Sequence, residues 1–453
     1  MSLTVPRYKG PGTLSFLNDA LEFITKPIEL IEKASMQCGS VFSIQILTVY
    51  NVWLRGNDLN KTYLQTREDV WSFAGGMGIF LNKIIEAGYW EHYKTLLASL
   101  SKYINRSAAQ QYTSKVTDEE TLKAASNWES ATDFELFDTV SSMVHKIIVR
   151  SLMGQDFYDQ NADELFNLLH AMEEDIGSIF SFILPDWVPH PPAKRLQKAR
   201  DRVKEIFLER LADRANADIS EKHQLQDYIA FSMEDRSTAP LKELMPSHHT
   251  LLMFAAHTST AAGIAWNIVT LLRHPEILQQ ITTELRSGPE VDESILLQAC
   301  IKETSRKYSG MKLLRLAREN SQVQGTNMTV PKGAVVSISP YLTHHDPANF
   351  DNPEVWDPMR WIAKNEEGLS LNAKMDQAKY MPFGGGSHRC VGEKLANIMV
   401  SRSLITLLKN YDVQWANLDV PRVTDFKNLN FDKVGSPWLR GGVRVCINKI
   451  TSR

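Results

Sequence analysis

The sequence predicts a mostly α-helical fold with minor β-structure. Two long stretches show helical patterning, whereas each apolar run of the kind found in strands is short. Of the 453 residues, 43% are hydrophobic and 23% are charged, as in ordinary globular proteins, so chains that are wholly disordered, collagen-like or coiled-coil are excluded. The chain has no internal repeat and no low-complexity linker, and we therefore expect a single domain over residues 1–453.

Each helical stretch has its own signature. Residues Ala193–Arg214 carry apolar side chains at intervals of three and four, with Lys and Arg on the other face, which predicts an amphipathic helix. The prolines of the preceding segment, Leu184–Pro192, predict that any helix or strand before this segment ends there. Residues His249–Leu272 are almost all apolar or small, which predicts a helix that is buried on every side and runs through the middle of the protein.

Four shorter runs have the composition of strands. They lie at Val41–Val52, Met328–Val330, Val335–Ile338 and Val443–Ile447. Because they are few and short, they predict only a minor contribution of sheet to the fold.

Charge and cysteine content exclude several function classes. The net charge of −3 gives no basic excess, so a nucleic acid is not expected as a partner. The four cysteines are far apart and form no CxxC pair, which argues against a disulfide framework and against a zinc site, and fits a reducing compartment. No apolar run reaches the roughly 18 residues of a membrane span, and the N-terminus has no signal-peptide core.

The strongest local feature is the segment MPFGGGSHRCVG, residues 381–392. Its three consecutive glycines permit backbone conformations that other residues avoid, and a helical pattern starts directly after it. Cys390 is therefore expected in a glycine-built loop that leads into a helix, where N–H groups and the helix N-terminus favour a thiolate. A lone cysteine is more often structural, but the pattern Phe383-x-x-Gly386-x-x-x-Cys390-x-Gly392 favours a chemical role.

This segment resembles the haem-binding loop of the cytochrome P-450 superfamily, the haem-thiolate monooxygenases. The resemblance implies the P-450 fold, with a buried central helix over haem b and small antiparallel sheets. It also implies that Cys390 is the metal ligand, the axial thiolate of the haem iron, which favours O–O cleavage. Phe383 and His388 would contact the cofactor from the same loop.

Three further segments resemble signatures of the family, in the expected order. Glu303 and Arg306 form an ExxR pair, and Arg360 lies in a segment similar to the Pro-x-Arg-aromatic element. An i, i+3 pair of this kind is by itself a common solvated contact. Together, the three residues are expected to form a buried charge network that holds the cysteine loop, with a structural and not a catalytic role.

The buried helix contains His257 and Thr258, similar to the acid–threonine position of the family's central helix. The resemblance implies a catalytic role in proton delivery during oxygen activation, since a hydroxyl and an imidazole can relay protons. The structural alternative is a core histidine whose ring nitrogens have hydrogen-bond partners, and a threonine whose hydroxyl bonds to the preceding helical turn. Trp90 and Lys94 resemble the family's Trp-x-x-x-Arg/Lys element and, with Arg315, are expected to bind haem propionates.

The resemblance covers nearly the whole chain and is strongest to the branch that contains sterol 14α-demethylases. Three departures bear on function: Lys307–Gly310 lacks the usual prolines, Ala255 replaces a glycine, and residues 69–90 do not match true sterol demethylases. We therefore expect a monooxygenase of specialised metabolism that oxidises a terpenoid, steroid-like or alkaloid substrate. The alternatives are a haem-thiolate isomerase or dehydratase that needs no external electrons, a true sterol demethylase, and a non-catalytic haem-binding protein.

The resemblance also implies partners and a location. Electrons would come from NADPH through a reductase. Relatives are anchored to the cytosolic face of the endoplasmic reticulum membrane, so an N-terminal anchor upstream of this sequence is expected.

Overall fold

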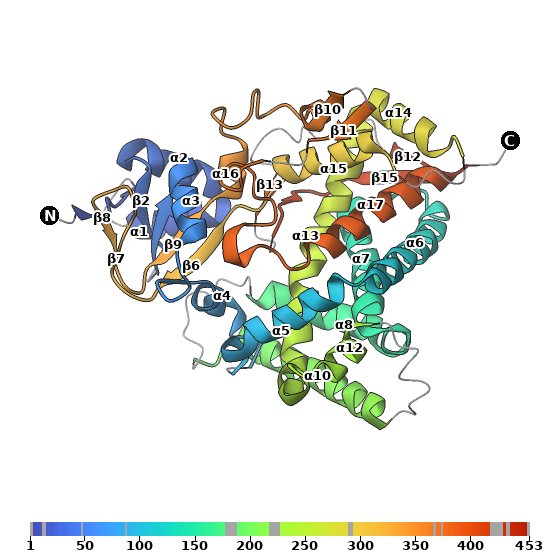
Figure 1. Ribbon diagram of the computed structural model, residues 1–453, viewed down its shortest axis with the longest axis horizontal. Coiled ribbons are helices and arrows are strands. Elements are labelled where there is room, and N and C mark those ends of the chain that lie inside the picture. Colours follow the sequence, from blue (N-terminus) through green and yellow to red (C-terminus); the bar gives the residue numbers. More distant parts are fainter. Residues whose placement is uncertain are drawn as a thin grey trace.

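A central helix separates a sheet-rich lobe from a helical lobe (Figure 1). The computed structural model describes residues 3–10, 15–46, 49–86, 88–176, 188–216, 227–288, 293–365, 368–372, 375–416, 429–431 and 435–450. The lobe that contains the N-terminus holds the largest sheet, and the opposite lobe is mostly helical, with small sheets along one side. The predicted mostly helical fold with minor sheet is confirmed. The single-domain assignment over residues 1–453 stays a prediction, and residues 184–187 of the proline-rich segment lie outside the described residues.

The helices fall into two groups along the chain. The first group is α1 (Ser15–Thr25), α2 (Pro27–Cys38), α3 (Asn57–Gln65), α4 (Phe73–Leu81), α5 (Tyr89–Ile104), α6 (Ser107–Glu129), α7 (Leu136–Met153), α8 (Gln155–Ile176), α10 (Pro191–Asn216) and α12 (Tyr228–Glu234). The second group is α13 (Met245–Arg273), α14 (Pro275–Leu285), α15 (Ile295–Lys307), α16 (Pro340–His344) and α17 (Glu393–Asn410), with 3-10 turns η1 (Ala239–Leu244), η2 (Pro358–Trp361) and η3 (Gly386–His388). The helix expected at 193–214 is α10, extended at both ends.

The described strands form small sheets, the largest of them five-stranded with the order β2-β3-β9-β6-β4. Its members are β2 (Val41–Ile46), β3 (Val49–Leu54), β4 (Trp71–Ser72), β6 (Leu313–Ala317) and β9 (Val335–Ile338). The other strands are β1 (Leu3–Thr4), β5 (Phe134–Glu135), β7 (Ser321–Gln322), β8 (Met328–Val330), β10 (Ile362–Asn365), β11 (Gly368–Leu371), β12 (Tyr411–Trp415), β13 (Leu429–Asn430), β14 (Trp438–Leu439) and β15 (Arg444–Lys449). Two pairs, β3–β9 and β1–β8, are parallel, so the sheets are mixed as well as antiparallel.

The run expected as one strand at Val41–Val52 is a hairpin. β2 and β3 pair antiparallel, Ile46 opposite Val49, and the two residues between them lie outside the described residues. In the sequence these two residues are Leu and Thr, so the run contains no Asn-Gly or Asp-Gly signal of a tight hairpin. The run therefore reads as one strand.

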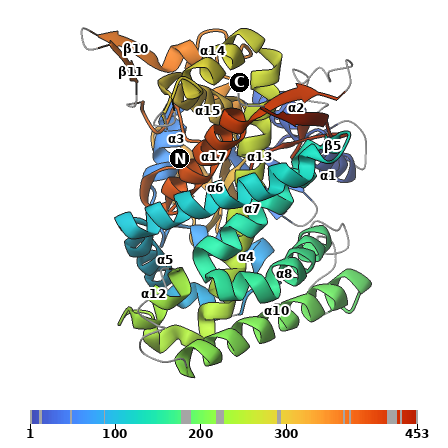
Figure 2. The same ribbon diagram turned by 90° about the vertical axis from the view of Figure 1, so that its right-hand side faces the viewer.

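Helix α13 is the longest described helix and lies at the centre of the molecule (Figure 2). It packs against α7, α10, α15 and α17, which explains why it has no polar face. Pro246 stands in its first turn, where a missing N–H costs nothing, and Pro275 follows its end. In Figure 2, α6, α7, α8 and α10 are stacked below α17, so the helical lobe covers one side of α13.

Candidate active site

Cys390 lies in a tight loop just before α17. Gly384 and Gly386 adopt φ angles of +69° and +63°, in the left-handed region that disfavours side chains. A Cβ atom at Gly386 would come within 2.3 Å of the carbonyl oxygen of Leu64, so the loop packs directly on α3. Two of the three consecutive glycines are thus required by backbone conformation, and Gly386 also by close approach to α3.

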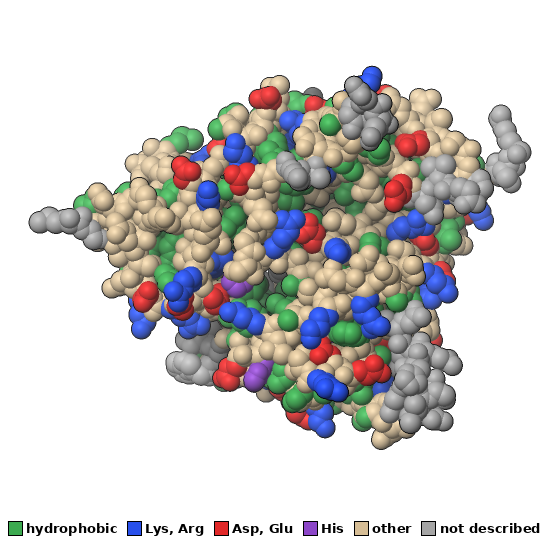
Figure 3. Space-filling view, viewed as in Figure 1, with side chains coloured by type: hydrophobic (Ala, Val, Ile, Leu, Met, Phe, Trp, Pro, Cys, Tyr) green, Lys and Arg blue, Asp and Glu red, His purple; other side chains and the backbone are tan. Residues whose placement is uncertain are grey.

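The Cys390 sulfur faces backbone donors. It accepts hydrogen bonds from the N–H groups of Gly392 and Glu393 at the start of α17, while its own N–H donates to Phe383 O at 2.9 Å. Burial raises the pKa of the Cys390 thiol, and the two N–H groups oppose that rise. Cys390 keeps accessible surface although protein atoms surround it, which indicates that it faces an internal opening. The space-filling view is hollowed near its centre (Figure 3).

Glu303 is the centre of a buried charge network. Arg306 donates two hydrogen bonds to its carboxylate at 2.9 Å each, and both side chains have no exposed surface. Arg360 Nε donates to Glu303 Oε1 at 3.1 Å, and Trp361 Nε1 donates to Oε2 at 2.8 Å. The N–H of Asp357 adds a further bond at 3.0 Å. The structure therefore brings together the three residues that the sequence grouped, and satisfies the buried carboxylate with five donated bonds.

His344, at the end of α16, connects this network to the cysteine loop. Its Nδ1 lies 3.1 Å from Arg306 O, and its Nε2 lies 2.8 Å from the nitrogen of Met381, where the loop begins. Because a carbonyl oxygen only accepts and an N–H only donates, the proton is on Nδ1. Burial lowers the pKa of His344 to about 3, so the ring is neutral. Arg306 Nη1 also donates to His344 O at 2.7 Å.

One face of α13 has accessible surface in the middle of the protein. Ala255 is exposed, and Ser259 and Gly263, each one turn further on, are partly accessible. Thr258 and His257, with 1% and 2% exposure, lie off this face. The indole N–H of Trp438 donates to Thr258 O at 3.3 Å.

His257 points towards α7 and α8. Its Nε2 lies 2.8 Å from Ser141 Oγ and 3.1 Å from Ser141 O, and its ring packs against that of His145. Its Nδ1 is 3.7 Å from Glu173 Oε1, too far for a hydrogen bond but within reach of an ion pair if the ring is protonated. The structure thus surrounds His257 with a hydroxyl and a buried carboxylate that the sequence did not associate with it. Its role in proton delivery stays a prediction.

A family model described as Cytochrome P450 matches residues 9–436 of the chain. The chain belongs to the cytochrome P450 family. The predicted family is thereby confirmed.

Relatives of this P450 include fungal and plant proteins. It is 45% identical to cytochrome P450 monooxygenase pynD of Aspergillus niger over 442 residues, 96% of this chain and 91% of that protein. It is 26% identical to obtusifoliol 14-alpha demethylase of Triticum aestivum, over 87% of this chain and 89% of that protein. Retinoic acid bound cyanobacterial CYP120A1 superposes with a TM-score of 0.79 at 18% identity, over 99% of this chain and 100% of that chain, which confirms the fold.

Arg315 on β6 fits the role of holding an anionic group of the haem. It is 1% exposed, and Nη1 donates to Thr66 O at 2.8 Å while the guanidinium lies 4.7 Å from the ring centre of Tyr63. Among the described residues, no carboxylate forms an ion pair with it. A buried guanidinium without an anion matches a haem propionate.

His388 has a protein carboxylate beside it. Its Nε2 lies 2.9 Å from Glu68 Oε2, and its ring stacks on Phe73 at 4.8 Å between ring centres. Burial opposes ionisation of Glu68, but bonds from His388 and from the N–H groups of Phe73 and Ala74 bring its pKa down to about 2. Glu68 is a residue of this site that the sequence did not reveal. The contact of His388 to a propionate stays a prediction.

Trp90 and Lys94 lie on α5 beside Tyr93, whose ring centre is 5.7 Å from that of Trp90 and 6.3 Å from that of Phe73. Trp90 Nε1 donates to Asn82 Oδ1 at 2.7 Å, and the indole lines a cavity of about 500 Å³ between α10 and the start of α13. Lys94 is exposed, and its ammonium lies 5.9 Å from the ring centre of Tyr93. The contacts of Trp90 and Lys94 to the haem propionates stay predictions.

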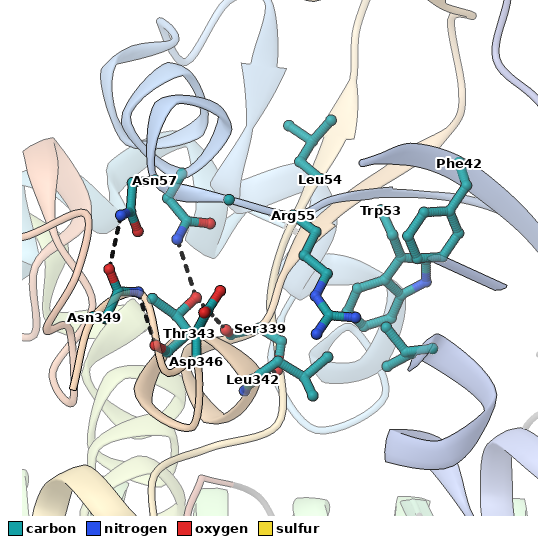
Figure 4. Close-up of a pocket in the computed structure, with 13 residues that line it drawn as sticks. Phe42, Trp53, Leu54, Arg55, Asn57, Ser339, Leu342, Thr343, Asp346 and Asn349 are labelled. Carbon is teal, nitrogen blue, oxygen red and sulfur yellow. Dashed lines mark hydrogen bonds between the residues drawn. The ribbon is translucent and has the colours of Figure 1, made fainter. Parts of the chain in front are cut away.

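A small polar recess lies between α3 and α16 (Figure 4). Asn60 donates to Thr343 Oγ1 at 3.0 Å and to Ala378 O at 2.9 Å, and Asn57 donates to Asn349 Oδ1 at 2.7 Å. Its free volume of about 10 Å³ has room for about one water. The recess therefore ties α3 and α16 to the segment that leads into the cysteine loop, and it is no substrate pocket.

None of the helices in the described part of the chain is long and apolar enough to cross a membrane. The anchor and the location at the endoplasmic reticulum stay predictions.

Proposed function

We propose that this P450 is a haem-thiolate monooxygenase of specialised metabolism that oxidises a hydrophobic small molecule of terpenoid, steroid-like or alkaloid class. The observation that carries the proposal is Cys390, whose sulfur accepts two N–H bonds at the start of α17 and retains accessible surface inside the protein. The 45% identity to a protein named as a monooxygenase supports the reaction type.

The residues divide into those that hold the cofactor and those that hold its loop. Cys390 would ligate the iron, and Arg315, Trp90, Lys94, Phe383 and His388 would contact the porphyrin or its propionates. When bound, the haem supplies oxygen activation, with electrons from NADPH passed on by a reductase. Glu303, Arg306 and Arg360 form the buried network near the loop, and His344 joins it to the loop through Met381.

The chain's own residues would exclude water and handle protons. The accessible face of α13 carries small side chains such as Ala255 and Ser259 and would leave room for a substrate. Thr258 and His257 would deliver protons, the latter with Glu173 as its acidic neighbour. Apolar side chains around a bound substrate would keep bulk water away from the reacting atoms.

The test begins with the haem-loaded protein. Its reduced carbon monoxide complex should have the red-shifted Soret band of thiolate ligation, and Cys390→Ala should lose it. An unchanged band in that variant would remove Cys390 as ligand. Substrates are then sought by spin-state difference spectra with sterols, terpenoids and alkaloids. Turnover without NADPH and reductase would instead support an isomerase or dehydratase.

A further inference from the structure

Lys312, the residue before β6, has an ammonium group in an aromatic setting. Its Nζ lies 5.0 Å from the ring centre of Phe23 on α1 and 5.3 Å from that of Phe80 on α4. Cation–π contacts of this kind stabilise a cation. Two rings from different helices thus form the walls of the position that the ammonium occupies.

No oxygen atom partners this ammonium within the described residues, and no ion pair includes it. Two lysines of the preceding helix, α15, differ. Lys302 Nζ donates to Asn372 O at 2.7 Å, and Lys307 Nζ donates to Glu354 O at 2.6 Å. Burial lowers the pKa of Lys312 to about 8, and no carboxylate opposes that shift.

The segment that carries Lys312 passes beside the cysteine loop. The next residue, Leu313, has a side chain that would lie 3.9 Å from a Cβ atom at Gly384 in that loop. Along an extended segment, residues three apart face opposite sides, so Lys312 and Arg315 do not point to the same partner. Lys312 itself is half-buried.

We propose that Lys312 binds an acidic group of the substrate, a carboxylate or enolate, and holds it between Phe23 and Phe80. The inference rests on the proposed function, and it adds a charge to the substrate class. A protonated lysine without an anion is costly in the free protein, and an anionic ligand would supply the missing partner. The apolar remainder of the substrate would extend towards Cys390. Lys312 is then a residue that determines specificity, and the haem and its loop do not depend on it.

The test uses probes that the iron anchors: alkanoic acids of increasing chain length with a terminal imidazole, each paired with its primary amide. The imidazole shifts the Soret band on binding, so the dissociation constant of each probe can be measured for haem-loaded protein. At the chain lengths that reach Lys312, the acid should bind about 10-fold or more tightly than the amide, and Lys312→Met should bring this ratio to about 1. Lys312→Glu should invert it, and Lys312→Arg should preserve it.

The matched control is Lys332→Met, which removes an exposed lysine from the turn between β8 and β9 and should leave the ratio unchanged. A ratio near 1 at every chain length in the wild-type protein, or an unchanged ratio in Lys312→Met, would overturn the proposal. Loss of haem in Lys312→Met would also overturn it, because the cation would then serve the cofactor.

Failure of the function and failure of this inference are distinguishable. Absence of the thiolate-type carbon monoxide band in the wild-type protein refutes the proposed function. The band with no preference for acids refutes only the role of Lys312. Thermal shifts with the same acids and amides report the preference without using the iron.

Discussion

Nε2 of His344 accepts a hydrogen bond from the N–H of Met381 at 2.8 Å, at the start of the loop that carries Cys390. The same ring donates from Nδ1 to Arg306 O at 3.1 Å. A neutral, fully buried imidazole thus joins the Glu303–Arg306 network to the cysteine loop. The loop is held by a specific hydrogen bond in addition to packing.

Replacing His344 by Phe should loosen this loop. The substitution leaves the N–H of Met381 and the carbonyl of Arg306 unsatisfied, which should cost about 2–4 kcal/mol of unfolding free energy. We expect faster loss of the thiolate-type carbon monoxide spectrum as well as a lower urea midpoint. His345→Phe is the matched control, because within the described residues this neighbouring ring bonds to Tyr341 O of the preceding turn and not to the cysteine loop. Equal spectral stability in the two variants would show that His344 does not position the loop.

The glycines of the loop should differ in their tolerance of alanine. Gly386→Ala should be the most damaging, because φ is +63° and the new Cβ would meet Leu64 O at 2.3 Å. Gly384→Ala has a strained φ of +69° but no contact under 3.6 Å, and should cost about 1 kcal/mol. Gly392→Ala, with φ of −78° and only a 3.8 Å contact to the Cys390 sulfur, should retain the spectrum. Haem content per protein measures the series, and a reversed order would contradict this account of the loop.

Much of the site could be predicted where its residues lie close together in the sequence. Cys390 and its glycines form one segment, and Glu303 and Arg306 are one turn apart, so their types and spacing carry the information. His344 contacts Met381 across 37 residues, and Glu68 meets His388 from the turn between α3 and β4. Neither has a local signal, because the fold alone brings these side chains together. The aromatic surroundings of Lys312 have no local signal either, because its two rings come from α1 and α4.

Thr258→Ala tests the proposed delivery of protons. We expect the variant to consume NADPH with less product and more hydrogen peroxide, measured with the reductase and a substrate from the binding screen. Ser259→Ala is the companion variant, because Ser259 lies on the accessible face of α13 and its hydroxyl donates to Ala255 O at 3.1 Å. If Ser259→Ala is uncoupled and Thr258→Ala is coupled normally, proton delivery belongs to Ser259 on the accessible face of α13 and not to Thr258.

His249 predicts a pH effect on stability. It is fully buried, its ring stacks on Phe207 at 5.2 Å between ring centres, and among the described residues neither ring nitrogen has a hydrogen-bond partner. Burial first, then the charges of His248 and Arg214, lower its pKa well below 6.5. Because the folded-state pKa is lower than the unfolded value, the unfolded chain takes up the proton first as pH falls below about 6.5, and stability is lost there.

His249→Phe should therefore act in two ways. At neutral pH it should raise the unfolding free energy by about 1 kcal/mol, because two buried polar atoms without partners are removed. Below pH 6.5 its stability should fall less steeply than that of the wild-type protein, by up to about 1.4 kcal/mol per pH unit for the one proton no longer taken up. Urea unfolding at several pH values measures both effects. His170→Gln, at a half-exposed histidine on α8, should leave the slope unchanged. A slope in His249→Phe that equals the wild-type slope would mean that His249 is already protonated in the folded protein.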